Sequence, residues 1–302
     1  MSDSATFQAV RLGMVAIVRD EADLIREWIE FHAGSGVDLF IVTDHRSVDG
    51  TPDILRELSR RHEIHAIRHD GPLREQSPRM TGMALRARER HGVDWVMLAD
   101  ADEFWVPRQG SLRQLAETAS APVLVCERSN MLPDRAAVEA PGYRFFHNVW
   151  RVARPFPDHP PRPEPDRELD WPLFLRRMPA KVLCATAGLQ EVLPGNHEVV
   201  HEAAARAPAA AEILHYPVRS WVDFERQTVA HGEAIGRDPS IPRDQGWHQR
   251  RLHELWRRGE LRRFHDLLLD EVETHCRGPE PRLVPDLRLW RAISPATVPA
   301  RR

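Results

Sequence analysis

The order of hydrophobic and polar positions along the first hundred residues predicts strands and helices in alternation. Short apolar runs, typical of buried parallel strands, stand at 14–19, 37–44, 64–69 and 94–100. Segments with apolar residues at helical spacing separate them, at 20–36, 51–58 and 77–92. This order predicts an α/β fold with a mostly parallel sheet, right-handed crossovers and helices on its faces.

Two of these helices have a clear inward face. In the first helix Asp20 is placed to cap the N-terminus. Its inward face consists of Leu24, Ile25, Trp28, Ile29 and His32. In the third helix the side chains expected to point inward are Met80, Met83, Ala84 and Ala87.

Beyond residue 106 the pattern is less regular. We expect a helix at 111–118, mostly helix from 221 onward, and strands at 122–128, 142–150, 181–187 and 211–215. The stretch 154–172 is rich in proline and charge, which predicts an exposed loop, with a lid as the alternative.

Composition narrows the class of protein. The chain has 302 residues, 42% of them hydrophobic, which suits one large domain or a domain with an appendage. A net charge of −3 argues against nucleic-acid binding. Cys126, Cys184 and Cys276 are widely spaced and form no CxxC pair, which favours a reducing compartment. Without a signal sequence or a long apolar stretch, a cytoplasmic protein is expected.

Polar residues follow three of the four predicted strands in the first hundred residues. They are Arg19, Asp20 and Glu21 after the first strand, Asp44 at the end of the second, and Asp100 and Asp102 after the fourth. Ligands of open α/β sheets bind beyond the carboxyl ends of the strands. These side chains therefore indicate a binding site at that edge.

Asp100 and Asp102 are the strongest candidates for chemistry. In an extended chain they would project to the same side, because the side-chain period of a strand is two. Two adjacent carboxylates stay ionised beside a positive charge, and Mg²⁺ or Mn²⁺ is a natural partner for their oxygens. The alternative is a solvated turn, where aspartate is common.

The chain resembles family 2-type glycosyltransferases of the GT-A fold. The resemblance rests on "RDEADLIREWIEFHAGSGVDLFIVTDHRSVDGT", "DWVMLADADEFWVP" and "LHYPVRSWVDFERQ", and extends over residues 12–235. It implies a GT-A domain at 12–220, with a nucleotide-sugar half at 12–106 and an acceptor half at 107–220. A helical C-terminal extension would then occupy 221–302.

The resemblance implies roles for the residues at the strand ends. Asp100 and Asp102 would hold Mn²⁺ or Mg²⁺ on the donor diphosphate. Asp44, Arg19, Asp20 and Glu21 would line the nucleotide pocket. His45 and Arg46 replace the usual pair of asparagines in the turn after the second strand, which leaves the base specificity open.

Several later residues are candidates for the same site. The resemblance implies that His215 completes the metal site, with His197 as its competitor; the alternative for His215 is a core histidine bonded to backbone. Lys181 could neutralise the diphosphate or be an ordinary surface lysine, and Arg219 could hold phosphate or form a structural salt bridge. Gln76 and Arg79, at the start of a helix, either face the donor or lie in a solvated turn.

An inverting transfer needs a general base for the acceptor hydroxyl. The candidates are Glu127 and Glu191, with Glu198 as a further one. Glu103, directly after the two aspartates, is expected to support the metal site rather than act in the reaction.

Two other patterns have less specific interpretations. The three histidines within 62–70 are typical of a solvated strand and its flanks, since no H-E-x-x-H helix is present. Segment 243–263 holds seven arginines against three acids, with leucines interleaved. It is either an amphipathic helix with an arginine face, or a contact for an anionic membrane surface or acceptor.

Taken together, these patterns predict a metal-dependent glycosyltransferase with a nucleoside-diphosphate sugar as donor, and the resemblance implies inversion. The acceptor would be a glycan, a lipid-linked sugar or a small molecule. The alternatives are a nucleotidyltransferase of related fold and a nucleotide-sugar binding protein without turnover.

Overall fold

The computed structural model describes residues 9–71, 75–156, 172–239, 241 and 246–294. Its largest sheet runs in the order β12 (Arg206–Pro208), β6 (Val123–Cys126), β9 (Lys181–Ala185), β4 (Trp95–Ala99), β1 (Leu12–Val18), β2 (Leu39–Asp44) and β3 (Glu63–Arg68). The four strands of the first hundred residues pair in parallel, and β9 is antiparallel to both of its neighbours. The predicted mostly parallel α/β sheet is therefore confirmed.

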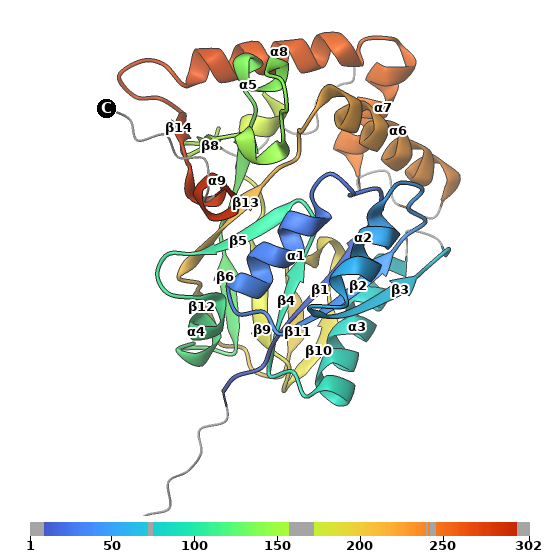
Figure 1. The fold of residues 1–302 in the computed structure, drawn as a ribbon, viewed down its shortest axis with the longest axis vertical. Helices are drawn as coiled ribbons and strands as arrows, with labels where there is room; N and C mark the ends of the chain where they lie inside the picture. The colour runs from blue at the N-terminus through green and yellow to red at the C-terminus, as the bar shows by residue number, and fades with distance from the viewer. Residues whose placement is uncertain (1–8, 72–74, 157–171, 240, 242–245, 295–302) are drawn as a thin grey trace, which may run out of the picture.

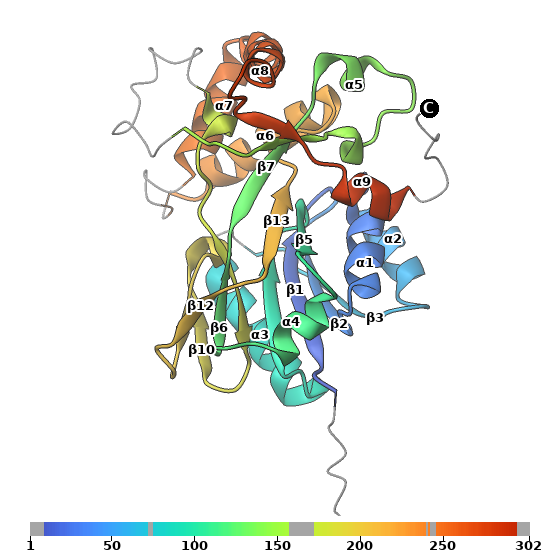
Figure 2. The ribbon, with the colours of Figure 1, turned by 90° about the vertical axis from the view of Figure 1, so that its left-hand side faces the viewer.

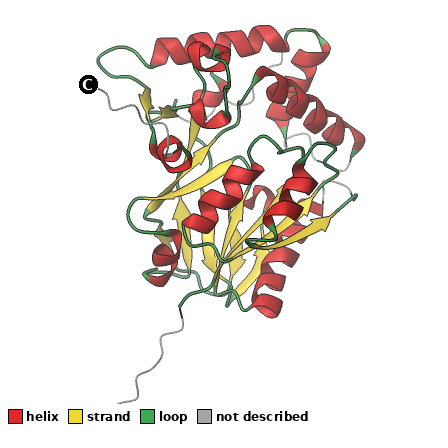
Figure 3. Cartoon of the chain, viewed as in Figure 1, coloured by secondary structure: helices red, strands yellow, loops and turns green. Residues whose placement is uncertain are grey.

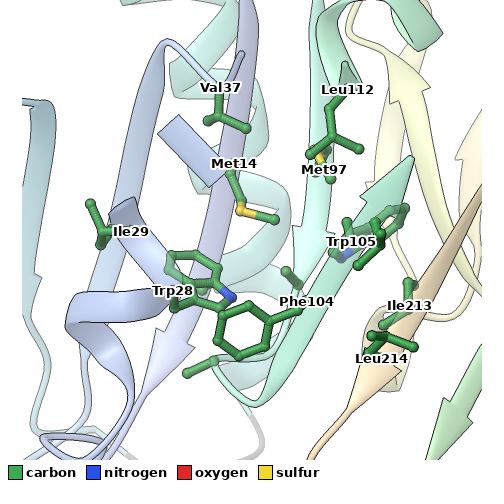
Figure 4. Close-up of a cluster of buried hydrophobic side chains, with 14 of the residues drawn as sticks. Met14, Trp28, Ile29, Val37, Met97, Phe104, Trp105, Leu112, Ile213 and Leu214 are labelled. Carbon is green, nitrogen blue, oxygen red and sulfur yellow. The ribbon is translucent and has the colours of Figure 1, made fainter. Parts of the chain in front are cut away.

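Helices cover both faces of this sheet, as Figures 1 and 3 show. Those of the first hundred residues are α1 (Ile25–Gly34), α2 (Thr51–Leu58) and α3 (Gln76–His91). Successive side chains of a strand point to opposite faces of the sheet, so alternate strand residues belong to two different apolar clusters, one on each face. Met14 and Phe40 pack with α1 and α2, and Val15 and Ile41 pack with α3. Figure 4 shows part of the first cluster, in which Trp28 meets Phe104. Every inward residue predicted for the first and third helices is buried.

Asp20 does not cap the first helix. Helix α1 begins at Ile25, and Asp20 lies in the left-handed region with φ 55°. Its Oδ1 accepts a hydrogen bond from the backbone N–H of Val48 at 2.7 Å, and its own N–H donates to Ser47 Oγ at 2.9 Å. The hydrogen bonds of Asp20 therefore connect the loop after β1 to the loop after β2. Both loops lie at the carboxyl edge of the sheet.

A second sheet crosses this edge. Its order is β14 (Leu283–Pro285), β8 (Trp150–Val152), β7 (Arg128–Leu132), β13 (Ala211–His215) and β5 (Glu103–Pro107). Figure 2 shows β7 and β13 rising beside each other from the main sheet. The strand predicted at 142–150 is instead a 3-10 helix at Phe145–His147, followed by β8. The remaining strands, β10 (Leu189–Val192) and β11 (Val199–His201), form a hairpin.

The later helices lie beyond the carboxyl edge (Figure 1). They are α5 (Arg135–Glu139), α6 (Trp221–Arg237), α7 (Trp247–Arg257) and α8 (Leu261–His275). The helical extension predicted for 221–302 also contains a strand: β14 joins the second sheet, and Leu289 of α9 (Arg288–Ile293) enters the main core. Of the predicted 154–172 loop, residues 157–171 lie outside the described residues.

The leucines of the arginine-rich segment are already used in packing. Leu252, Leu255 and Leu261 are buried in the core formed with α6 and α8. They are therefore not available to anchor this segment in a membrane. Among the described residues, no helix has the length and apolar character needed to cross one.

Ser111→Ala is expected to lower the free energy of unfolding by about 1 kcal/mol, the usual cost of losing an N-cap. Ser111 caps α4 (Leu112–Glu117): its Oγ accepts from the Gln114 N–H at 3.2 Å, and the Gln114 side chain accepts from the Ser111 N–H at 3.0 Å. Urea denaturation measures the change. Ser111→Asp keeps a capping oxygen and should behave as wild type; equal losses in both variants would contradict the capping role.

Candidate active site

The two aspartates lie in a turn between β4 and β5. The Glu103 N–H donates to the Asp100 carbonyl at 3.2 Å, and Glu103 Oε2 accepts from the Asp100 N–H at 3.0 Å. The chain is thus turned rather than extended here, so the side-chain period of a strand does not determine how the two carboxylates project. Asp100 faces β9 and Asp102 faces β13, so that each carboxylate has its own set of partners.

Asp100 belongs to a cluster of charges around Lys181, the only lysine in the sequence. Lys181 Nζ donates to Asp100 Oδ2 at 2.7 Å and to the Gly195 carbonyl at 3.0 Å. Asn196 Nδ2 donates to the other Asp100 oxygen at 3.2 Å. Burial alone would raise the pKa of Asp100, but the Lys181 ammonium lowers it below its ordinary value. Asp100 is therefore held in its ionised form.

Glu103 contacts this cluster from its buried side. Its side chain is fully buried, with Oε1 2.6 Å from Arg128 Nη1 and 3.4 Å from Lys181 Nζ. The Trp28 indole N–H donates to the Glu103 carbonyl at 3.0 Å, which ties the turn to α1. The supporting role predicted for Glu103 agrees with these contacts.

Asp102 faces His215, and Asn130 orients that histidine. Asn130 Nδ2 donates to the Phe174 carbonyl at 2.7 Å, which turns its Oδ1 toward His215 Nδ1 at 2.6 Å. An amide oxygen can only accept, so Nδ1 carries a proton and Nε2 points at Asp102 Oδ2, 3.2 Å away. Burial acts against ionisation of Asp102, but His215 lowers its pKa well below the ordinary value.

The donor set suits a divalent metal only in part. A carboxylate oxygen and an imidazole nitrogen are ligands that Mn²⁺ accepts, and the Asp102 side chain is 22% exposed. Among the described residues, the group of three or more possible ligands within 4.8 Å of one another lies elsewhere, at Glu63, His65 and His91. Asp102 and His215 therefore fit a metal as two ligands, and Asp100 is held apart by Lys181.

Arg219 is paired with carboxylates. It is 2% exposed, and lies 2.7 Å from Glu21 through Nη2 and 2.7 Å from Asp23 through Nε. These contacts agree with a structural salt bridge at Arg219 rather than with a guanidinium group free to bind phosphate. Burial raises the pKa of Glu21 to about 8, although Arg219 acts in the opposite direction. Gln227 of α6 also lies 3.4 Å from Glu21.

Glu21→Gln is expected to remove one source of pH dependence in stability. Because the pKa of Glu21 is raised from 4.5 to about 8, the folded chain keeps a proton in that range that the unfolded chain releases. The bound proton stabilises the folded chain fully at pH values below the pKa of Glu21 in the unfolded chain. This contribution to the free energy of unfolding falls as pH rises toward 8, by at most about 1.4 kcal/mol per pH unit. Urea denaturation between pH 5 and pH 8 should show wild type losing stability relative to the variant. Parallel profiles would contradict this assignment.

The other predicted nucleotide contacts lie at the same edge. Asp44 is buried, and its Oδ1 accepts from the Ser47 N–H at 3.1 Å. Arg19 Nε lies 3.6 Å from Asp20. Arg79 Nη2 donates to Glu75 at 3.1 Å, one residue before α3 begins at Gln76. These side chains hold loops of the edge in place, and none of their hydrogen bonds reaches Asp100 or Asp102.

The structure does not bring the remaining candidates to Asp102. His197 Nδ1 lies 3.0 Å from the Ala180 carbonyl, and burial together with Lys181 lowers its pKa to about 4. Glu198 pairs with Arg206 at 3.3 Å. Glu127 and Glu191 are exposed and make no contact with either aspartate. Their assignment as general base stays a prediction from sequence.

Sequence reasoning missed four residues that surround the aspartates and His215. Arg128 and Asn130 are two residues apart on β7, and their alternation could have placed both on one face. Burial is the main cause that lowers the pKa of His231 on α6 and of His248 on α7. At His231 the negative charge of Asp102 acts in the opposite direction. No local pattern marks these two histidines, because only the packing of α6 and α7 over the edge brings them there.

Comparison with known proteins gives a partial family match. The model of glycosyltransferase family 92 matches residues 15–123, a segment that includes both aspartates. A family 92 protein of Ricinus communis is 31% identical over 102 residues, which are 33% of this chain and 17% of the relative. One of Oryza sativa is 34% identical over 90 residues, 29% of this chain and 15% of the relative. The chain thus matches less than a fifth of the length of these two relatives.

The matching family model is that of family 92, whereas the motifs resemble family 2-type enzymes. The coarser expectation, similarity to a glycosyltransferase family, is confirmed. Among solved structures, TarS of S. aureus in complex with UDP-GlcNAc covers 79% of this chain and 75% of that chain, with 12% identity and a TM-score of 0.40. A likeness at this level identifies neither the activity nor the ligand of this chain.

Proposed function

We propose that this chain is a glycosyltransferase that moves a sugar from a nucleoside-diphosphate donor to a hydroxyl acceptor. One observation carries the proposal: the segment that matches the family model contains an ionised, partly exposed Asp102 at the carboxyl edge of the parallel sheet. Ligands of such sheets bind at this edge. The acceptor is a glycan, a lipid-linked sugar or a small molecule.

Asp102 and His215 would hold Mn²⁺ or Mg²⁺ in this proposal. The bound cation would supply positive charge to the departing diphosphate. Asn130 keeps the His215 proton on Nδ1, so that the Nε2 lone pair is available when the ring is neutral. Lys181 is fully buried and acts through Asp100, which it keeps ionised and fixed in direction.

The nucleotide would lie between the ends of β1 and β2 and the helix α6. Glu21 and Asp44 are two of the acidic side chains there, and Glu21 is in reach of α6 through Gln227. Inversion, implied by the resemblance, requires a base on the acceptor side. Glu127 and Glu191 remain the sequence-based candidates for it.

A thermal-shift screen tests donor binding. Uridine, guanosine, thymidine and cytidine diphosphates and their sugars are added with and without Mn²⁺, since a ligand of the native state raises the melting temperature. We expect at least one metal-dependent shift, retained in Asp53→Asn, whose carboxylate is exposed on α2. No shift with any of these ligands would overturn the proposal. Binding without sugar transfer to any acceptor or to water would favour a binding protein.

A further inference from the structure

Three possible metal ligands meet at the end of the sheet that is remote from the aspartates. Glu63 and His65 lie on β3 with one residue between them, and His91 is the last residue of α3. One ligand atom from each lies within 4.8 Å of the others. Glu63 pairs with Leu39 at the start of the strands, whereas Asp44 pairs with Arg68 at their carboxyl ends. This cluster is therefore separate from the proposed donor site.

The spacing of the three groups suits a bound cation better than direct hydrogen bonding. Glu63 Oε1 is 3.5 Å from His91 Nδ1 and 3.8 Å from His65 Nε2. Both separations exceed a normal N–H···O hydrogen bond, about 2.7–3.2 Å. Two ligands about 2.0–2.1 Å from a tetrahedral Zn²⁺ lie roughly 3.4 Å apart. Both carboxylate–imidazole separations lie within a few tenths of an ångström of this value.

Arg11 fixes the direction of the carboxylate. Its Nη2 donates to Glu63 Oε2 at 2.6 Å, so that Oε1 is the oxygen left facing the two histidines. Such outer contacts orient metal ligands in known sites. The two histidine rings are neighbours, with centroids 4.3 Å apart and planes tilted by 51°.

We propose that Glu63, His65 and His91 bind one divalent transition-metal ion of the zinc type. Two imidazoles and one carboxylate form a ligand set that zinc accepts, with water in the fourth position. The side chains of His65 and Glu63 are 37% and 42% exposed, which leaves room for that water. The ion would join the edge strand β3 to the end of α3, and its role is to stabilise this edge of the fold.

Zinc binding to the full-length chain is measured by isothermal titration calorimetry, in the Asp102→Asn background so that the donor site does not contribute. We expect one ion per chain and a higher melting temperature with Zn²⁺ than with EDTA. His65→Ala and His91→Ala should abolish both effects. Arg11→Ala should weaken binding by about tenfold, as loss of an orienting contact does.

His62→Ala is the matched control, because this neighbouring histidine pairs with Glu30 at 2.9 Å instead. It should bind zinc as tightly as the parent chain. Should His91→Ala fail to fold, the half-exposed His65 provides the decisive variant, with its fold checked by circular dichroism in EDTA. The proposal is overturned if saturable binding is absent, or if His65→Ala affects it no more than His62→Ala. Neither outcome bears on donor binding, which requires other residues.

Discussion

Glu103→Gln is expected to lower the free energy of unfolding by about 3–5 kcal/mol, the usual cost of breaking a buried ion pair. The variant keeps the size of the side chain but leaves Arg128 buried without its carboxylate, and leaves Lys181 with Asp100 as its remaining carboxylate. An amide cannot replace it in either orientation. One Glu103 oxygen accepts from Arg128 and the other from the Asp100 N–H, so the NH₂ group would face a donor on one side or the other.

Urea denaturation at neutral pH measures this loss. Glu191→Gln is the matched control, because Glu191 is exposed on β10, and surface changes of this kind stay within about 0.5 kcal/mol. If Glu103→Gln were no more destabilising than Glu191→Gln, the buried contacts of Glu103 with Arg128 and Lys181 would not stabilise the fold as stated here.

Asp102→Asn is expected to reduce the rate of sugar transfer by about 10²–10³-fold or more, the range found when one stabilising group of an active site is removed. The variant keeps an oxygen near His215 but loses the negative charge that a metal ion requires. The melting temperature without ligand should also fall, because the lowered pKa of Asp102 means that its charge stabilises the folded chain.

Initial rates of nucleoside-diphosphate release, with the donor chosen from the thermal-shift screen, measure this effect. Asp53→Asn, which removes an exposed carboxylate of α2, should retain the wild-type rate. A rate for Asp102→Asn within tenfold of wild type would contradict the role of Asp102 in the reaction.

Much of the parallel half of the fold could be predicted, because its strands are short apolar runs and its helices have apolar residues at helical spacing. The inward face of α3, for example, is carried by Met80, Met83 and Ala87 at helical spacing. Strand β5 could not be predicted in this way. It begins at Glu103, a charge that normally marks a chain leaving the core. Glu103 is buried here only because Arg128 and Lys181, distant in sequence, arrive from β7 and β9 to pair with it.

The same distinction applies to the candidate site. Asp100 and Asp102 could be singled out from their position after an apolar run, and His215 from the resemblance. Their partners could not be, since the turn directs the two carboxylates to different strands. Asn130 reaches His215 only because β7 and β13 pair in parallel, with these two residues opposite each other. Local pattern contains no information about that register.

The C-terminal end shows a third limit. Strand β14 has three residues and α9 has six, too short for any period to appear. Their places depend on the pairing of β14 with β8 and on the burial of Leu289 in the main core. Both are tertiary contacts with segments far away in the chain.

The proposed metal ligands are Asp102 and His215, and Lys181, which pairs with Asp100 in the same turn, provides a probe for a direct measurement. Because Lys181 is the only lysine in the sequence, ¹⁵N-lysine labelling gives one backbone amide signal from the cluster beside Asp100. Mn²⁺ is added with an equimolar mixture of uridine, guanosine, thymidine and cytidine diphosphates, and Mg²⁺ serves as the diamagnetic reference. We expect Mn²⁺ to broaden the Lys181 signal in wild type and not in Asp102→Asn. A signal that stays sharp in wild type, or broadens equally in both, would contradict it.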